Sequence, residues 1–213
     1  MFREKKFLII ITSAAIMLPA LFGLIFWNQL PTEIATHWNA AGEVDGWSSK
    51  SFAVLGLPAI LLGVHLLCIA MTAIDPKHQN HGSKILNLVL WISPVLSIAC
   101  CGATYAHSFG IDMDMNRFMP IIVGIVFIVI GNYLPKCKQN YTIGIKLPWT
   151  LNNEEVWNRT HRLCGRLWVV GGIVMATSAF LPDESMVAIM VSVLVILIAV
   201  PVVYSWQLHK KLI

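Results

Sequence analysis

Long apolar runs separated by polar stretches are the main pattern of this chain. Each run is close to the roughly 20 residues that an α-helix needs to cross a bilayer. The pattern predicts six spans, at 7–27, 52–73, 85–106, 118–134, 167–181 and 186–206. The fifth is short, so we expect the preceding helix to extend it, with Arg166 reaching the interface. The chain is therefore predicted to be an all-α, polytopic membrane helix bundle.

The polar stretch 135–166 combines an alternating segment with an amphipathic helix. Apolar and polar residues alternate from Tyr141 to Leu147, which indicates an extended segment before Pro148. Asn152 precedes Glu155 by three residues, as in a capping box, so a helix is expected to begin near Asn153. One face of that helix is formed by Val156, Thr160, Leu163 and Leu167, and its polar faces by Glu155, Asn158, Arg159, Arg162 and Arg166. Glu155 and Arg159 are spaced as an i,i+4 ion pair.

The polar stretch 28–51 is dense in turn-forming, titratable and aromatic residues. Gly42 and Gly46 are typical of turns, and Trp38 and Trp47 suit the headgroup level of a membrane. Two interpretations stay open. The stretch is either an ordered cap whose polar side chains bond turn backbone, or an outward-facing recognition surface.

Composition excludes a soluble core. Hydrophobic residues make up 57% of the 213 residues, charged residues 12%, and the mean hydropathy is +0.71. No length is left for a separate soluble domain. We expect a first module at 1–110, with three spans and the outer loop 28–51, and a second at 111–213, with three spans and the cytoplasmic basic loop 135–166.

The positions of the cations predict the orientation. With a cytoplasmic N-terminus, every Lys and Arg except Lys50 and Arg117 falls on the inside, as the positive-inside rule requires. Both termini are therefore expected in the cytoplasm. The basic loop alone holds Lys136, Lys138, Lys146, Arg159, Arg162 and Arg166. The basic pI of about 8.9 thus reflects membrane topology, and no direct nucleic-acid partner is expected.

Motifs of catalysis, phosphate binding and metal binding are not found in the sequence. We find no HExxH, GxSxG, Walker A or GxGxxG pattern, so no catalytic residue, cofactor or metal site is expected. No Asp, Glu, Lys or Arg lies in the middle of a predicted span, where ion-coupled carriers keep one. His65 does lie there, but hydrogen bonding within the bundle is its favoured role. A cation site built from His37, Asp45, Asp112 and Asp114 would match no known ligand spacing.

The outer stretch follows the pattern LPxxIPxHWNxxGxxDGWxxK. Its matching residues are Leu30, Pro31, Ile34, His37, Trp38, Asn39, Gly42, Asp45, Gly46, Trp47 and Lys50, while Ala35 replaces the usual proline. In this the chain resembles the SdpI/YfhL-type bacterial membrane proteins, whose N-terminal module is a domain of unknown function. The resemblance implies an outer ligand-binding site formed by His37, Trp38, Asn39, Gly42, Asp45, Gly46, Trp47 and Lys50.

The inner stretch is similar to the second module of that family, with its GN, N-x-x-x-GI-R-TPWTL and W-x-x-TH-R elements. Lys146 replaces the usual arginine and Leu147 the usual threonine. The resemblance implies a partner-binding site formed by Asn132, Asn140, Gly144, Ile145, Lys146, Pro148, Trp149, Thr150, Trp157, Thr160, His161 and Arg162.

The resemblance also implies a function. Namesake members are multi-pass proteins of the bacterial cytoplasmic membrane that give immunity against a secreted, membrane-active toxin peptide and draw a cytosolic repressor to the membrane. The first hypothesis is thus a non-enzymatic immunity and signalling protein, with membrane lipids, a toxin peptide and a repressor as partners. The alternative is a small membrane enzyme or carrier for a lipid or peptide, with His37 or His161 carrying protons. Because the sequence indicates no buried carboxylate and no nucleophile–base pair, the first is favoured.

Overall fold

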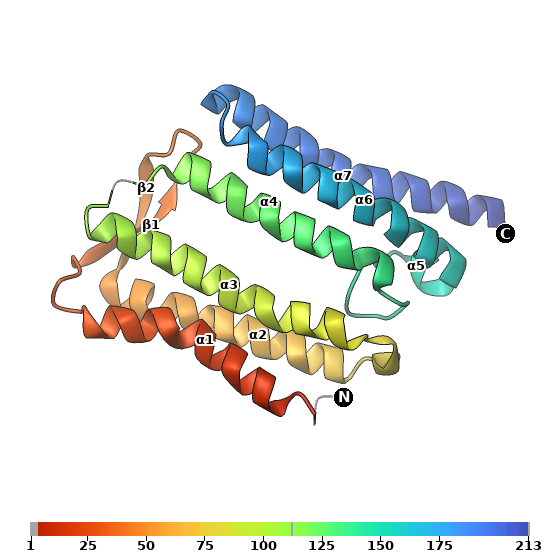
Figure 1. Ribbon diagram of the computed structural model, residues 1–213, viewed down its shortest axis with the longest axis horizontal. Coiled ribbons are helices and arrows are strands. Elements are labelled where there is room, and N and C mark those ends of the chain that lie inside the picture. Colours follow the sequence, from red (N-terminus) through yellow and green to blue (C-terminus); the bar gives the residue numbers. More distant parts are fainter. Residues whose placement is uncertain (1–3, 112, 213) are drawn as a thin grey trace. The chain divides into compact units, whose positions relative to one another are not determined.

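Helices dominate the computed structural model, which describes residues 4–111 and 113–212 (Figure 1). Within that part the α-helices are α1 Lys6–Ile25, α2 Leu57–Ala73, α3 Ser83–Ser108, α4 Met115–Tyr133, α5 Pro148–Asn152, α6 Glu154–Ser178 and α7 Asp183–Leu212. A π-helical turn, Phe52–Gly56, leads into α2, and short 3-10 turns occupy His78–Asn80 and Leu134–Lys136. The predicted all-α, polytopic membrane bundle is confirmed.

Five helical segments are long and apolar enough to cross a membrane. Among the described residues they are Lys6–Ile25, Phe52–Ala73, Ser83–Ser108, Met115–Lys136 and Asp183–Leu212. Helix α6 has 25 residues, but its first half carries the charged residues of the basic loop. The count of six spans therefore stays a prediction, as does the location of the termini.

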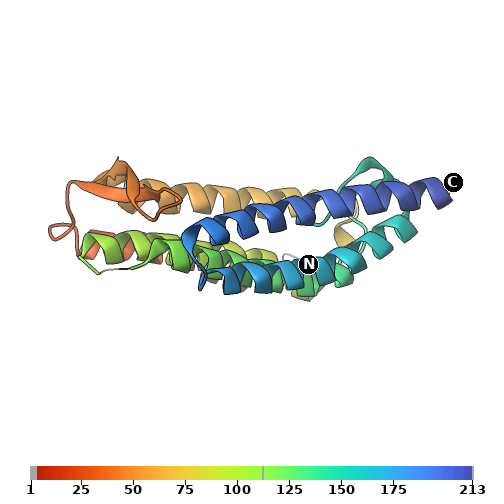
Figure 2. The same ribbon diagram turned by 90° about the horizontal axis from the view of Figure 1, so that it is seen from above.

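The outer loop contains two strands that the sequence analysis missed. Strands β1 Glu33–Trp38 and β2 Val44–Ser49 form an antiparallel hairpin, seen beside the start of α2 in Figure 2. Gly46 lies within β2, opposite His37, so its predicted place in a turn was wrong. The polar sequence of β2 has no apolar period, and only Ile34 and Ala35 of β1 are buried. A hydrophobic pattern therefore could not indicate these strands.

The contacts divide the chain into two compact units. The first contains the described residues up to Ala70 and Val89–Phe118, and the second contains Met71–Leu88 and the residues from Met119 onward. The expected modules at 1–110 and 111–213 stay a prediction.

Hydrogen bonds join the helices of the first unit. Ser97 on α3 donates to the backbone oxygen of Ile16 on α1 at 2.8 Å. His65 on α2 is buried, and its Nε2 lies 3.3 Å from the hydroxyl of Thr12 on α1. This contact agrees with the expected bundle-bonding role of His65.

Small residues bring helices of the second unit close together. Helices α6 and α7 lie side by side, and α4 packs on α6 through glycines (Figure 1). A Cβ at Gly124 would lie 2.5 Å from the backbone oxygen of Gly172, and one at Gly131 would lie 2.9 Å from that of Gly165. Larger side chains would therefore separate the two helices.

Candidate functional site

The basic loop is a folded structure within the second unit. We call the segment 134–166 and the turn 75–81 together the basic platform. Cys137 and Trp157 of the platform form an apolar cluster with Ile85 of α3, and Tyr133 of α4, Ile143 and Leu151 pack against it. Trp157 is fully buried, and its indole N–H donates to the backbone oxygen of Cys137 at 2.8 Å. The start of α6 is thereby fixed to the segment that precedes it.

Asp75 is a buried carboxylate that the sequence analysis did not identify. Its side chain accepts hydrogen bonds from the backbone N–H of Lys77 at 2.8 Å, the backbone N–H of Tyr141 at 2.9 Å and the hydroxyl of Thr142 at 2.9 Å. Burial tends to raise the pKa of Asp75, but these hydrogen bonds and nearby His81 outweigh it, so the pKa lies below its usual value. The carboxylate thus joins the turn 75–81 to residues 141–142.

His81 is the neighbour of Asp75 and is buried with it. Its Nε2 lies 3.2 Å from Oδ2 of Asp75, and burial lowers the pKa of His81 although the carboxylate opposes that shift. A neutral His81 can donate its Nε2–H to Asp75, which leaves Nδ1 buried without a hydrogen-bond partner. His81 is therefore part of the buried structure of the platform and not of a solvated loop.

Asn140 determines the path of the chain after Cys137. Asn140 is fully buried, and its side-chain oxygen accepts the backbone N–H groups of Thr142 at 2.9 Å and Ile143 at 2.6 Å. Its amide group donates to the backbone oxygens of Lys138 and Ile143. Because these bonds turn the chain, the segment from Tyr141 to Leu147 is not a strand, and the prediction of a regular extended segment was wrong.

Gly144 lies directly against His161 and Trp157. Its φ is +120°, and an added Cβ would overlap Nε2 of His161 and lie 3.0 Å from the ring of Trp157. The backbone N–H of Ile145 then donates to Nε2 of His161 at 3.0 Å. Glycine is therefore required at 144 by both its backbone angle and its neighbours.

The imidazole of His161 is held on both sides. Nδ1 lies 2.8 Å from the backbone oxygen of Trp157, so this nitrogen carries the proton, and the ring stacks on Trp157 with centroids 4.0 Å apart. Burial lowers the pKa of His161 to about 4, although the hydrogen bond to Trp157 opposes that shift. A neutral ring with both nitrogens occupied has no free site for carrying protons.

Pro148 begins the short helix α5, and Thr150 closes its first turn. The Thr150 hydroxyl accepts from the backbone N–H of Leu147 at 2.9 Å and lies 2.8 Å from the backbone oxygen of Ile145. The indole N–H of Trp149 donates to the hydroxyl of Ser205 on α7 at 2.7 Å. Trp149 thus connects α5 to α7.

The start of α6 differs by one residue from its prediction. Asn153, rather than Asn152, is the N-cap, and its side-chain oxygen accepts the backbone N–H groups of Glu155 and Val156. The capping box with Glu155 is therefore absent, because that residue is one position too early. Glu155 pairs with Arg159 as predicted.

In the platform, neutral polar side chains are buried and cationic side chains are exposed. Asn140, Thr150, Thr160 and His161 are buried, whereas all of the loop's cations are exposed: Lys136, Lys138, Lys146, Arg159, Arg162 and Arg166. Of the predicted partner-binding residues, Asn140, Gly144, Ile145, Thr150, Trp157 and His161 converge. Asn132 is exposed on α4, and the hydroxyl of Thr160 is buried without a hydrogen-bond partner. The converging residues shape the platform, while Lys146 and Arg162 lie on its surface.

The predicted outer residues gather on the hairpin of the first unit. Asn39 closes its turn by accepting the backbone N–H groups of Ala41 at 2.9 Å and Glu43 at 3.0 Å. Gly42 has φ +77°, as a turn requires. Lys50 donates to the backbone oxygen of Trp27 at 2.9 Å, so it anchors the hairpin.

The surface of the hairpin presents aromatic and titratable groups. Nδ1 of His37 lies 2.5 Å from Oδ1 of Asp45, and both side chains are exposed. Trp38 and Trp47 each contact the ring of His107 on α3, with centroids 5.7 and 6.4 Å apart, and Trp47 is 56% exposed. The hairpin therefore has an exposed indole at its surface.

No metal cluster is found on the hairpin or elsewhere in residues 4–111 and 113–212. No group of three His, Cys, Asp or Glu side chains there could hold an ion. Of the four residues weighed for a cation site, Asp114 pairs with Arg117 and Asp112 lies outside the described residues.

Both polar stretches, 28–51 and 135–166, lie at least largely within regions that match known protein families. Residues 136–205 match the SdpI/YfhL protein family, and residues 14–62 match a domain of unknown function, DUF1648. The immunity protein SdpI of Bacillus subtilis is 27% identical over 205 residues, which cover 95% of this chain and 96% of that protein. No solved structure matches the chain.

Proposed function

We propose that this chain, which belongs to the SdpI/YfhL protein family, is an immunity protein of the bacterial cytoplasmic membrane. The observation that supports this most is the similarity to an immunity protein along nearly the whole of both chains. The similarity includes the hairpin and the platform, rather than the apolar spans alone. The proposed activity is protection against a secreted, membrane-active peptide.

The hairpin is the proposed site for that peptide. Trp47 is largely exposed, and Trp38 beside it is partly exposed, on a turn held by Asn39. Exposed indoles on a rigid support are frequent anchors in protein recognition. The exposed carboxylates of Glu33, Glu43 and Asp45 would favour a cationic peptide over an anionic one.

The basic platform is the proposed site for a cytosolic regulator and for lipid headgroups. Its buried polar groups hold the backbone in one conformation, so its exposed cations are presented by a rigid support. Each Lys or Arg near an anionic membrane contributes about 1 kcal/mol of attraction. A regulator with an acidic surface would be attracted for the same reason.

The hydrogen bonds of His161 and Asp75 do not favour the alternative of an enzyme or carrier. His161 has both nitrogens in hydrogen bonds, and the buried carboxylate of Asp75, which the sequence did not indicate, accepts several hydrogen bonds. Neither group is free to exchange protons with a substrate. His37, the other proton carrier named for that alternative, pairs with Asp45 at the exposed surface of the hairpin, so the non-enzymatic proposal rests on the similarity to an immunity protein.

A growth assay tests the proposed protection. A toxin-sensitive bacterium would express this chain or an empty vector and be challenged with the peptide toxin that the Bacillus subtilis immunity protein neutralises. Protection by the chain supports the proposal. Equal killing of both strains, with the chain present at normal level in the membrane, would reject protection against that toxin, and a panel of other membrane-active peptides would then test the wider proposal.

A further inference from the structure

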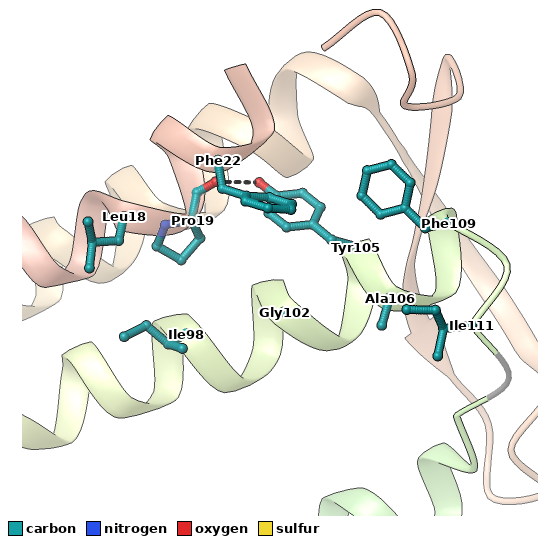
Figure 3. A pocket seen from close by; sticks show the side chains of 9 residues that line it. All are labelled: Leu18, Pro19, Phe22, Ile98, Gly102, Tyr105, Ala106, Phe109 and Ile111. Atoms are coloured by element: carbon teal, nitrogen blue, oxygen red, sulfur yellow. Dashed lines mark hydrogen bonds between the residues drawn. The ribbon is translucent and has the colours of Figure 1, made fainter. Parts of the chain in front are cut away.

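A narrow trough lies between α1 and α3 in the first unit (Figure 3). Its volume is about 410 Å³. In Figure 3 the ring of Tyr105 reaches from α3 toward α1, with Phe22 and Phe109 beside it. Gly102 lines the middle of the trough, and a Cβ added there would meet no atom within 4 Å. The space beside Gly102 is therefore open and could accept added atoms.

The lining of the trough is suited to hydrocarbon. None of its side chains is charged, and its one polar side-chain group, the hydroxyl of Tyr105, already donates to the backbone oxygen of Pro19 at 3.0 Å. A polar ligand group placed there would lose its hydrogen bonds to water without replacement. The trough therefore selects an apolar ligand.

The dimensions of the trough limit the shape of that ligand. From Ile98 on α3 to Phe109, the residue after its end, the lining spans eleven residue steps, or about 16 Å at the usual helical rise. The space between the atoms of the trough, open solvent included, is about 800 Å³, which over that length gives a mean cross-section of about 50 Å², whereas an α-helix about 10 Å wide needs about 80 Å². A helix is thus too wide, and one extended hydrocarbon chain fits.

We propose that the trough binds one acyl chain of a membrane phospholipid. Both of its helices are among those long and apolar enough to cross a membrane, so acyl chains are the abundant slender apolar molecules around them. Leu18 and Ile98 are about half exposed at its edges and would contact the chain. The rings of Phe22 and Tyr105, with centroids 5.6 Å apart, provide a firm wall. This site involves neither a toxin nor a regulator.

Photolabelling tests the proposal with the full chain in vesicles. The vesicles would contain phosphatidylcholine, phosphatidylglycerol and a phospholipid with a diazirine in its acyl chain. After illumination, mass spectrometry would map the labelled residues. We expect labelling concentrated at 18–22 and 98–111, above that of α7, although α7 is the more apolar helix. Labelling spread evenly over all apolar helices would overturn the proposal.

Matched glycine variants distinguish labelling inside the trough from labelling of the general lipid-facing surface. Gly102→Leu fills the trough, and the concentrated labelling should be lost. Gly63→Leu is the control, because a Cβ at Gly63 on α2 also meets no atom within 4 Å, and its labelling should equal that of the wild type. Unchanged labelling in Gly102→Leu would overturn the proposal. Ala106→Leu is a second filling variant and should act in the same way.

A competition experiment distinguishes a chain from a helix. Unlabelled phospholipid should suppress the concentrated labelling, whereas a synthetic polyleucine transmembrane peptide at the same molar amount should not. Suppression by the peptide as strong as that by the phospholipid would show a helical occupant and contradict the assignment.

Discussion

The backbone N–H of Ile145 donates to Nε2 of His161 at 3.0 Å. This contact joins two motifs that are sixteen positions apart in the sequence, and the Nδ1 of the same ring is engaged by Trp157. The ring must be neutral to accept the bond, because a protonated imidazole has no acceptor nitrogen. The platform is therefore held together by the neutral form of one buried histidine.

The platform should lose stability in mild acid. Burial lowers the pKa of His161 to about 4 from its usual 6.5, so between these values the unfolded chain binds a proton that the folded chain does not. Stability is fully present above 6.5 and should fall by up to about 3 kcal/mol as the pH falls toward 4. Thermal unfolding in detergent, from neutral pH to mild acid, measures this loss. The variant His161→Gln should lose less, and equal losses in both proteins would contradict the role of His161.

Substitution of Gly144 should damage the platform even when the new side chain is small. Gly144→Ala places a Cβ against His161 and Trp157 at φ +120°, so we expect a loss of about 2 kcal/mol or more. Gly82→Ala is the matched control, because a Cβ there meets no atom within 4 Å. Unfolding midpoints of the two variants in the same detergent provide the comparison. Similar midpoints would show that the clash is relieved at little cost.

Asp75 should matter more for the fold than a surface acid does. Asp75→Asn keeps the size of the side chain but replaces one accepting oxygen with an N–H₂ group that cannot accept from Tyr141 or Thr142. Hydrogen bonds to a charged group contribute about 1.5–3 kcal/mol each, so a loss in that range is expected. Glu154→Gln, at an exposed position, is the control and should have little effect. The same unfolding assay measures both.

The sequence predicted the helices well because a bilayer requires about 20 apolar residues in a row. The start of α6 was placed within one residue by its Asn-rich cap, and the buried face with Val156 and Thr160 followed from helical spacing. Asp75 could not be found in the same way. Its partners Tyr141 and Thr142 are more than sixty positions away, and no local pattern shows that their N–H and hydroxyl groups cover a carboxylate.

The motifs of the hairpin did not indicate its strands, whereas the motifs of the platform indicated its key residues but not their contacts. The resemblance selected the correct stretch, 28–51, but its strands were missed because apolar and polar residues do not alternate along β2. In the platform, the motif residues Asn140, Gly144 and His161 were selected, and their contacts depend on tertiary packing that spacing alone does not determine.

Trp47 on the hairpin should contribute to protection and not to stability. Its side chain is 56% exposed, so Trp47→Ala should leave the amount of protein in the membrane unchanged and weaken protection. Trp38→Ala and Asp45→Ala should act in the same direction. Survival of toxin-sensitive cells, at matched membrane levels, measures the effect. Full protection by all three variants would leave the hairpin as a structural cap only.

The predicted orientation can be tested with reporter fusions. Because nearly all cations lie on one side of the predicted spans, reporters after Lys50 or Asp114 should be external, and reporters after Lys138 or Lys211 should be cytoplasmic. Alkaline phosphatase is active outside and green fluorescent protein fluoresces inside. A cytoplasmic signal at Lys50 would invert the orientation.

The most direct test of the account compares four platform variants in the protection assay at matched membrane levels. Trp149→Ala removes the bond to Ser205, and Gly144→Val forces a side chain against His161, so both should abolish protection. Arg159→Lys and Arg162→Lys keep exposed positive charges and should protect as the wild type does. If instead the lysine variants fail while the Trp149 and Gly144 variants protect, the shape of the platform is not the working feature, and bidentate arginine contacts are.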